Sequence, residues 1–165
     1  MGEKAVHIGE QLRQEIKSET DRLYLQYKNE KTEYVEKMQK DGNTENLYKI
    51  FDDELYKSIF KKYMKIKNKE LADRIGTSEE SDISRYKNLT TKDGKRYKQA
   101  DSFLGRKENV INLGLALKLP FVDFCRFIWS RSHAFPTDIY DYALIEQIKK
   151  KENMEYSEPK IERDL

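Results

Sequence analysis

The chain has 165 residues, enough for one domain of ordinary size or for a smaller domain with extensions. Hydrophobic residues make up 37% of the sequence and charged residues 38%, so the whole chain cannot form one deep-cored globule. Seven Gly and three Pro are few for the turns of a β-sandwich or barrel, whereas long helices need almost none. We therefore predict an all-α fold.

Composition also argues against several kinds of site. The single Cys125 cannot form an internal disulfide or a cysteine-based zinc site, and His7 and His133 lie far apart in the chain. No glycine-rich phosphate loop is present. We therefore expect no enzyme activity, no metal and no cofactor, with Cys125 in the core and His133 in a structural or solvent-exposed role. Because no apolar run or signal-peptide core occurs, we expect a cytoplasmic protein without membrane contact.

Charge and apolar residues are unevenly distributed along the chain. The net charge is only +2, but residues 85–108 hold eight basic and three acidic residues. Apolar residues account for 13 of the first 46 positions and for 24 of the 46 positions in 104–149. We predict three parts: a charged helical extension (1–46), a domain containing the core (47–149) and a polar tail (150–165).

The extension has the pattern of one long helix that ends at Asp41-Gly42-Asn43, because Gly and Asn supply the left-handed residue that stops helices. So thin an apolar stripe is marginal in water, and it requires packing either on the domain or on a second copy. Both alternatives are open from the sequence. The stripe consists of Ile8, Leu12, Ile16, Leu23, Tyr27, Tyr34 and Met38, interrupted by Glu19 and Glu30.

A second amphipathic helix follows. Apolar residues recur at spacings of three and four, as on one buried helical face. They are Leu47, Ile50, Phe51, Leu55, Ile59, Phe60, Tyr63 and Ile66. The acidic run Asp52-Asp53-Glu54 favours a helix start at that point, because carboxylates in a first turn oppose the positive end of the helix dipole.

Residues 68–88, NKELADRIGTSEESDISRYKN, have the pattern of two short helices joined by a tight turn. Leu71-Ala72 suits a close helix crossing, and Gly76 suits a turn with positive φ. Ser78 is the expected cap of the second helix. The segments LADRIG and ISRYKN resemble the corresponding parts of the Cro/repressor-like (XRE) helix-turn-helix family.

The resemblance continues downstream and covers about residues 55–148. Residues 106–119 resemble the family's fourth helix, in which a charged start precedes a leucine-rich stretch. Residues 121–129 follow with the apolar spacing of a fifth helix. Thr137 is predicted to cap one more helix.

The resemblance implies a lambda-repressor-like bundle that binds double-stranded DNA as a transcriptional regulator. Helix 69–75 would brace the DNA backbone, and helix 78–87 would lie toward the major groove. A homodimer is expected, because one short helix reads too few base pairs for useful specificity. The DNA-contacting residues implied in these helices are Lys69, Ser78, Ser81, Ser84, Arg85 and Lys87.

A basic insert separates the predicted third and fourth helices. Asp93-Gly94 between polar residues is a hairpin signal, so residues 91–98 are predicted to form either a small β-wing or a solvated loop. In both cases the insert adds positive charge that suits contact with phosphates. Its candidate residues are Lys92, Lys95, Arg96 and Lys98.

Three acidic residues at the start of helix 78–87 lead to a second hypothesis. Glu79, Glu80 and Asp82 repel a polyanion, and acidic residues at this place favour helix capping. Ile83 also lies seven residues after Gly76, whereas the family's usual spacing is six. The alternative is therefore a protein-interaction module, of the phage-type inhibitor or antitoxin-like kind, in which the three acids contact another protein.

Overall fold

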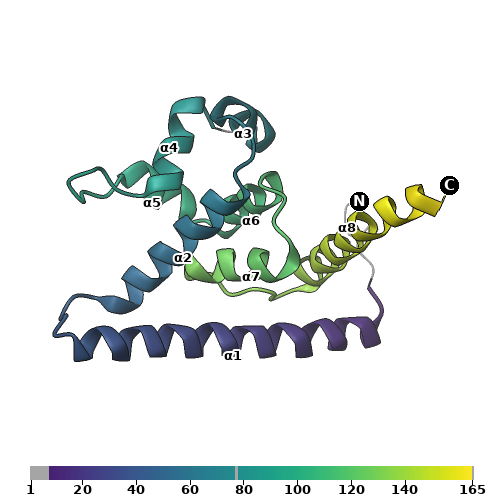
Figure 1. Cartoon of the computed structure of the whole chain (residues 1–165), viewed down its shortest axis with the longest axis horizontal. Coiled ribbons are helices and arrows are strands. Elements are labelled where there is room, and N and C mark those ends of the chain that lie inside the picture. Colours follow the sequence, from purple (N-terminus) through teal and green to yellow (C-terminus); the bar gives the residue numbers. More distant parts are fainter. Residues whose placement is uncertain (1–7, 77, 165) are drawn as a thin grey trace.

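The structure is a computed structural model that describes residues 8–76 and 78–164, with side chains described through residue 153. Its secondary structure confirms the all-α class: the described residues form helices and no strand (Figure 1). None of the helices in this part of the chain combines the length and the apolar character needed to cross a membrane. The helices are α1 (Glu10–Lys40), α2 (Leu47–Tyr63), α3 (Asn68–Ile75), α4 (Glu80–Asn88), α5 (Lys98–Leu104), α6 (Lys107–Ala116), α7 (Phe121–Ser130) and α8 (Ile139–Asp164).

The long helix α1 lies along one side of the molecule and packs on α2, α7 and α8 (Figure 1). Ile16, Tyr27 and Val35 are its buried apolar residues. Thr20 fills a gap in the predicted stripe, and its hydroxyl donates to the Ile16 carbonyl at 3.0 Å, so this buried polar group is satisfied. Of the two alternatives for α1, the structure therefore shows packing on its own domain.

The two glutamates that interrupt the stripe flank the buried face of α1 and form ion pairs across it. Glu19 pairs with Lys149 of α8, and Glu30 accepts from Arg126 of α7 at 2.8 Å. A residue that breaks an apolar pattern thus marks a cross-helix contact here.

Helix α2 begins at Leu47, where the Asn46 side chain accepts from the Lys49 N–H at 3.3 Å. The predicted start at the acidic run is therefore wrong. Asp52 and Asp53 lie inside the helix and bind side chains of other elements, so these carboxylates serve tertiary contacts and not the first turn.

Helices α3 and α4 pack on each other across a turn in which Gly76 has φ +82°, a conformation that strains other residues. Ser78 does not cap α4, contrary to the prediction. Glu79 occupies the cap position, and its N–H donates to the Asp82 carboxylate at 2.9 Å. The Ser78 hydroxyl lies 3.1 Å from the Tyr86 hydroxyl instead.

The basic insert is ordered, but it is not a β-wing. Thr90 and Arg96 form an isolated antiparallel bridge around a turn, and the described residues contain no strand there. Helix α5 follows directly and was not predicted, because its sequence KQADSFL buries only Ala100 and Leu104 fully. Phe103 stacks on Tyr86 with ring centroids 4.1 Å apart, which holds α5 against α4.

The core is one buried cluster in which α7 packs on α1, α2, α6 and α8, and more than half of its residues lie in 104–149, as the apolar content of that segment predicts. Gly114 permits a close helix contact, because a Cβ there would lie 2.9 Å from the Phe124 ring. Cys125 is buried in this core, as expected. Asp138, and not Thr137, caps α8, since its carboxylate accepts from the Asp141 N–H at 3.0 Å. The predicted boundary at residue 149 falls inside α8, and residues 1–7, including His7, lie outside the described part.

Candidate nucleic-acid interface

The outer face of α4 is exposed. Ile83 and Tyr86 point into the core, whereas Ser81, Ser84 and Asn88 are exposed on the opposite face. Among the described residues α4 contacts α2, α3 and α5, and α1 lies on the far side of the molecule (Figure 1). The long N-terminal helix therefore does not cover α4.

The exposed residues of α4 carry hydrogen-bonding groups suited to base edges. Asn is the side chain that pairs bidentately with adenine, and Ser hydroxyls bond to several bases. Ser84 already accepts from the Asn68 amide at 3.3 Å, which leaves its own hydroxyl proton to donate elsewhere. Asn88 was not among the predicted contacts, although it ends the ISRYKN segment on which the resemblance is based.

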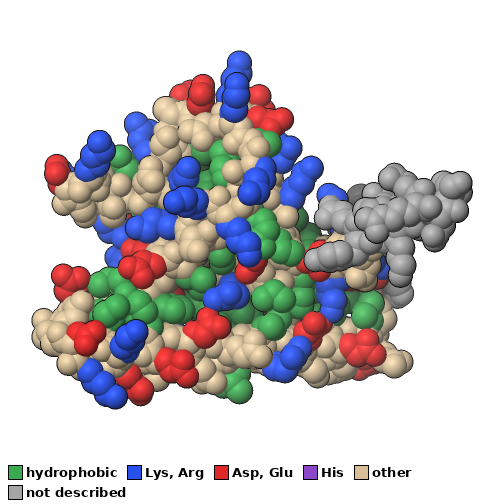
Figure 2. Space-filling view, in the orientation of Figure 1, with side chains coloured by type: hydrophobic (Ala, Val, Ile, Leu, Met, Phe, Trp, Pro, Cys, Tyr) green, Lys and Arg blue, Asp and Glu red, His purple; other side chains and the backbone are tan. Residues whose placement is uncertain are grey.

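Lysines surround this face and lack ion-pair partners among the described residues. Lys69 lies in the first turn of α3, Lys87 lies on α4, and Lys92, Lys95 and Lys98 follow on the turn and α5. Figure 2 shows the basic side chains spread over this upper part of the molecule, with acidic ones between them.

Four further lysines, which were not predicted, lie in the last turn of α2 and in the link to α3, and two of them, Lys65 and Lys67, line a shallow hollow together with Lys69. The segment KKYMKIKNK joins the end of α2 to α3 and leads into Lys69. Its charge was hidden because residues 47–84 taken together hold eight basic and eight acidic residues. The additional residues are Lys61, Lys62, Lys65 and Lys67.

Arg96 is not available to a phosphate. Its guanidinium donates to both Asp101 carboxylate oxygens at 2.8 and 2.7 Å and to Asp53 at 2.9 Å. The hydrogen bond to Asp101 is the main reason why the pKa of Arg96 is raised above its usual value. Arg85 is partly engaged too, since it donates to Gln99 at 2.8 Å.

Arg96 belongs to an ion network with Asp53, Asp101 and Arg131 that fixes the turn to α2 and α7. Arg131 donates to Asp53 at 2.8 Å and lies over the Tyr56 ring at 4.6 Å. Burial alone would raise the pKa of Asp53, but hydrogen bonds and charge from Arg131 and Arg96 outweigh it and lower that pKa. These contacts of Arg96 hold in place the turn that carries Lys92 and Lys95.

The three acidic residues at the start of α4 differ in their contacts. Asp82 accepts from the Glu79 N–H and from Gln99 at 2.7 Å, so it serves helix capping and the α4–α5 contact. The side chains of Glu79 and Glu80 are exposed. Glu79 also takes part in the capping box of α4, whereas the Glu80 carboxylate forms no hydrogen bond or ion pair among the described residues.

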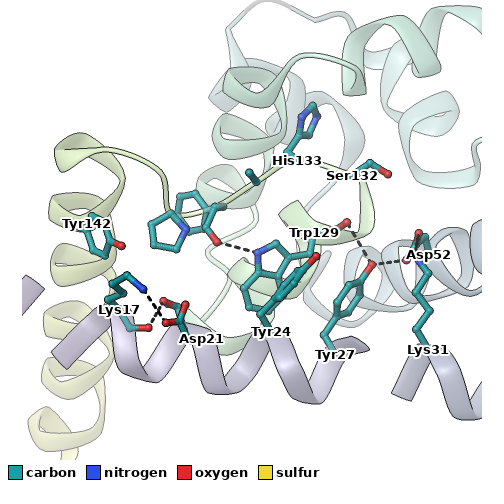
Figure 3. Close-up of a pocket in the computed structure, with 14 residues that line it drawn as sticks. Lys17, Asp21, Tyr24, Tyr27, Lys31, Asp52, Trp129, Ser132, His133 and Tyr142 are labelled. Carbon is teal, nitrogen blue, oxygen red and sulfur yellow. Dashed lines mark hydrogen bonds and ion pairs between the residues drawn. The ribbon is translucent and has the colours of Figure 1, made fainter. Parts of the chain in front are cut away.

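A hollow of about 640 Å³ lies between α1 and residues 132–136 (Figure 3). Tyr27 donates to Asp52, which also accepts from Lys31 at 2.6 Å, and Lys17 pairs with Asp21 at 2.9 Å. Burial, and then the bond to Asp52, raises the pKa of Tyr27 far above its usual value, so its hydroxyl stays protonated. These polar groups satisfy one another, which identifies the hollow as part of the α1 attachment.

His133 lies at the edge of this hollow in a structural position, where its Nε2 is 2.8 Å from the Leu104 carbonyl. Within the described residues, no group of three or more His, Cys, Asp or Glu side chains is placed to hold a metal ion. No protein-family model matches the chain, and no curated protein or solved structure matches it at a significant level. The functional argument therefore rests on the geometry of the α4 surface.

Proposed function

We propose that this protein is a sequence-specific DNA-binding transcriptional regulator of the XRE type, with α3 and α4 as its helix-turn-helix. The observation that carries the proposal is the uncovered α4 face, bordered by lysines without ion-pair partners in the described part of the chain. Such lysines suit a polyanion, because each phosphate that they neutralise releases counterions.

In the proposed complex α4 lies in the major groove. Ser81, Ser84 and Asn88 face base edges, and Lys69 and Lys87 contact the adjoining phosphates. Lys92, Lys95 and Lys98 reach phosphates that flank the site, held in place by the ion network below them. Arg96 takes no part in DNA contact.

The regulator is proposed to bind as a homodimer to a site with two-fold symmetry. One helix of nine residues spans few base pairs, so a second copy is needed for useful specificity. The half-sites would then lie about one DNA turn apart, roughly 34 Å.

The direct test is selection of binding sites from a random duplex library, followed by affinity measurements. We expect an enriched symmetric motif, and Ser84→Ala with Asn88→Ala should weaken binding to it by about 10- to 100-fold. Ser18→Ala, an exposed serine of α1, is the matched control and should leave affinity unchanged. The proposal is wrong if no duplex binds more tightly than about 10⁻⁴ M, the level of weak nonspecific binding.

A protein-interaction role is the second candidate, and the exposure of Glu79 and Glu80 favours it. In that case the α4 surface contacts another protein, as in phage-type inhibitors or antitoxin-like proteins. The double change Glu79→Lys/Glu80→Lys separates the two candidates. If α4 approaches phosphates, the change should raise the affinity for DNA. If α4 binds a protein, the change should abolish binding of that partner and should not produce sequence-specific binding to a DNA duplex.

A further inference from the structure

A second surface of the molecule combines an apolar floor with a basic rim. We call it the α6–α8 groove. It has a volume of about 440 Å³ between the end of α6, the start of α7 and the middle of α8. A smaller hollow of about 240 Å³ adjoins it and shares Tyr63 and Lys118. The groove is lined by Tyr63, Leu115, Lys118, Leu119, Pro120, Ile148, Lys151 and Glu152, and the hollow adds Lys65, Ile66, Arg74, Ala116 and Leu117.

The floor of the groove has apolar surface that is not fully covered. Leu115 is 41% exposed and is one of few large hydrophobic side chains in the described part to be so open. Leu119 and Ile148 are nearly buried and form the walls beside Pro120. A ligand that fills this space must therefore bring apolar side chains of its own.

The rim is strongly basic. Lys65, Lys118 and Lys151 are exposed, and they form no ion pair within the described residues. Arg74 donates to the Ala116 carbonyl at 3.0 Å and has no carboxylate partner there. Glu152 is the one carboxylate among the described residues that line the groove and the hollow, so their charge favours an acidic ligand.

Glu152 itself shows how a carboxylate is accepted at this place. One of its carboxylate oxygens accepts from the Phe121 N–H at 2.6 Å, at the start of α7, where no side chain caps the helix. The N-terminus of α7 is thereby already occupied, so the groove offers no free cradle of N–H groups for a phosphate. The remaining binding groups are flexible ammonium groups above an apolar floor, which suits a peptide better than a nucleic-acid backbone.

Lys118 has an unusual backbone for its residue type. It follows α6 with φ +57°, a left-handed conformation that helix ends normally assign to Gly or Asn. A lysine at this position places a positive charge at the rim of the groove although its backbone conformation is unfavourable for a residue other than Gly or Asn.

We propose that the α6–α8 groove binds a short acidic segment of another protein that carries large apolar anchor residues on one helical face. The anchors contact Leu115 and Ile148, and the carboxylates of the segment pair with Lys118 and Lys151. The lining of the groove and of the adjoining hollow contains no residue of α4, although Lys65 of the hollow belongs to the lysine-rich segment that leads into α3.

The test uses the full chain and a fluorescein-labelled helical peptide of about 15 residues, with Leu or Phe at every third or fourth position and Glu between them. Fluorescence anisotropy near physiological salt should give a Kd on the order of 10⁻⁵ M. Lys118→Gln/Lys151→Gln should weaken binding about tenfold, and Leu115→Ser should weaken it by a similar factor. A peptide with the same charge but Ala in place of the anchors should bind at least tenfold more weakly.

The matched control is Lys95→Gln/Lys98→Gln, which removes the same charge from the turn and α5 and should leave peptide affinity unchanged. Lys118→Gly should lower the affinity for the peptide without lowering Tm, because glycine adopts the positive φ of that position without strain. Equal binding of the Ala peptide, or equal losses from the two lysine pairs, would show nonspecific charge attraction and overturn the proposal. The proposal is also overturned if Lys118→Gln/Lys151→Gln reduces the affinity for duplex DNA while peptide binding stays intact.

Discussion

The α1 side and the α3–α5 side of this molecule use charge in opposite ways. Where α1 meets the body, the charged side chains at the contact have partners: Glu19 with Lys149, Glu30 with Arg126, and Lys31 with Asp52. Around α4 the lysines border an exposed face and lack such partners in the described part of the chain. A net charge of +2 therefore conceals paired charges that hold the fold and unpaired ones that are available to a ligand.

The largest expected effect comes from the apolar attachment of α1. Ile16 is 1% exposed, so Ile16→Ala should lower the free energy of unfolding by about 2–5 kcal/mol through lost burial and an incompletely filled cavity. Leu25→Ala on the same helix, where the side chain is 59% exposed, should change it by less than about 0.5 kcal/mol. Urea denaturation measures both, and equal effects would mean that α1 does not pack as described.

The ion network should give the next largest effect. Asp53→Asn removes the carboxylate that both Arg131 and Arg96 bind, and it leaves the largely buried Arg131 poorly paired. We expect a loss of about 2–3 kcal/mol in urea denaturation, less than for a fully buried pair because water reaches the site. Asp93→Asn at the exposed turn is the control, and a loss of the same size there would remove any special role for the network.

The same network predicts a pH dependence. Because the folded-state pKa of Asp53 is lowered, its contribution to stability is complete above the ordinary Asp pKa of about 3.9 and is lost as pH falls through the lower folded value. The stability difference between the wild type and Asp53→Asn should therefore shrink in acid below about pH 4. Thermal unfolding over a pH series checks this, and a difference that stays constant into strong acid contradicts the assignment.

A smaller effect is expected from the hydroxyl of Tyr27. Tyr27→Phe removes its hydrogen bonds to Asp52 and to the Trp129 carbonyl but keeps the buried ring, so the loss should be about 1–2 kcal/mol. Tyr48→Phe, on a half-exposed tyrosine, should cost less than about 0.5 kcal/mol. Matching losses in the two variants would show that the Tyr27 hydroxyl is not an anchor of α1.

Much of this fold follows from patterns in the sequence, and the differences have physical causes. The helical class, the long α1 and the burial of Ile83 follow from spacing and composition alone. The engagement of Arg96 does not, because it depends on which residues meet Asp53 in three dimensions. The start of α2 was misplaced because Asn46 caps the helix at Leu47, whereas the acidic run serves tertiary contacts. Ion pairs between residues far apart in the sequence cannot be predicted from the local spacing of apolar residues.

The candidate interface was also only partly predictable. Lys69, Lys92, Lys95 and Lys98 were named from charge and resemblance, and the structure leaves all four exposed. Asn88 was missed, and helix α5 was hidden by its short and mostly polar sequence. Helices this short derive most of their stability from packing, such as the stacking of Phe103 on Tyr86, which the local sequence does not reveal.

The most direct test of the difference between the two sides is the salt dependence of DNA binding. Plots of log K against log salt for the wild type should be steep, and Lys92→Ala/Lys95→Ala should reduce the magnitude of the slope by about 2, roughly one for each lost phosphate contact. Lys28→Ala/Lys37→Ala on the exposed side of α1 should leave the slope unchanged while both double variants keep the stability of the wild type. Equal slopes for the two pairs, or a slope near zero for the wild type, would contradict a nucleic-acid interface at α4.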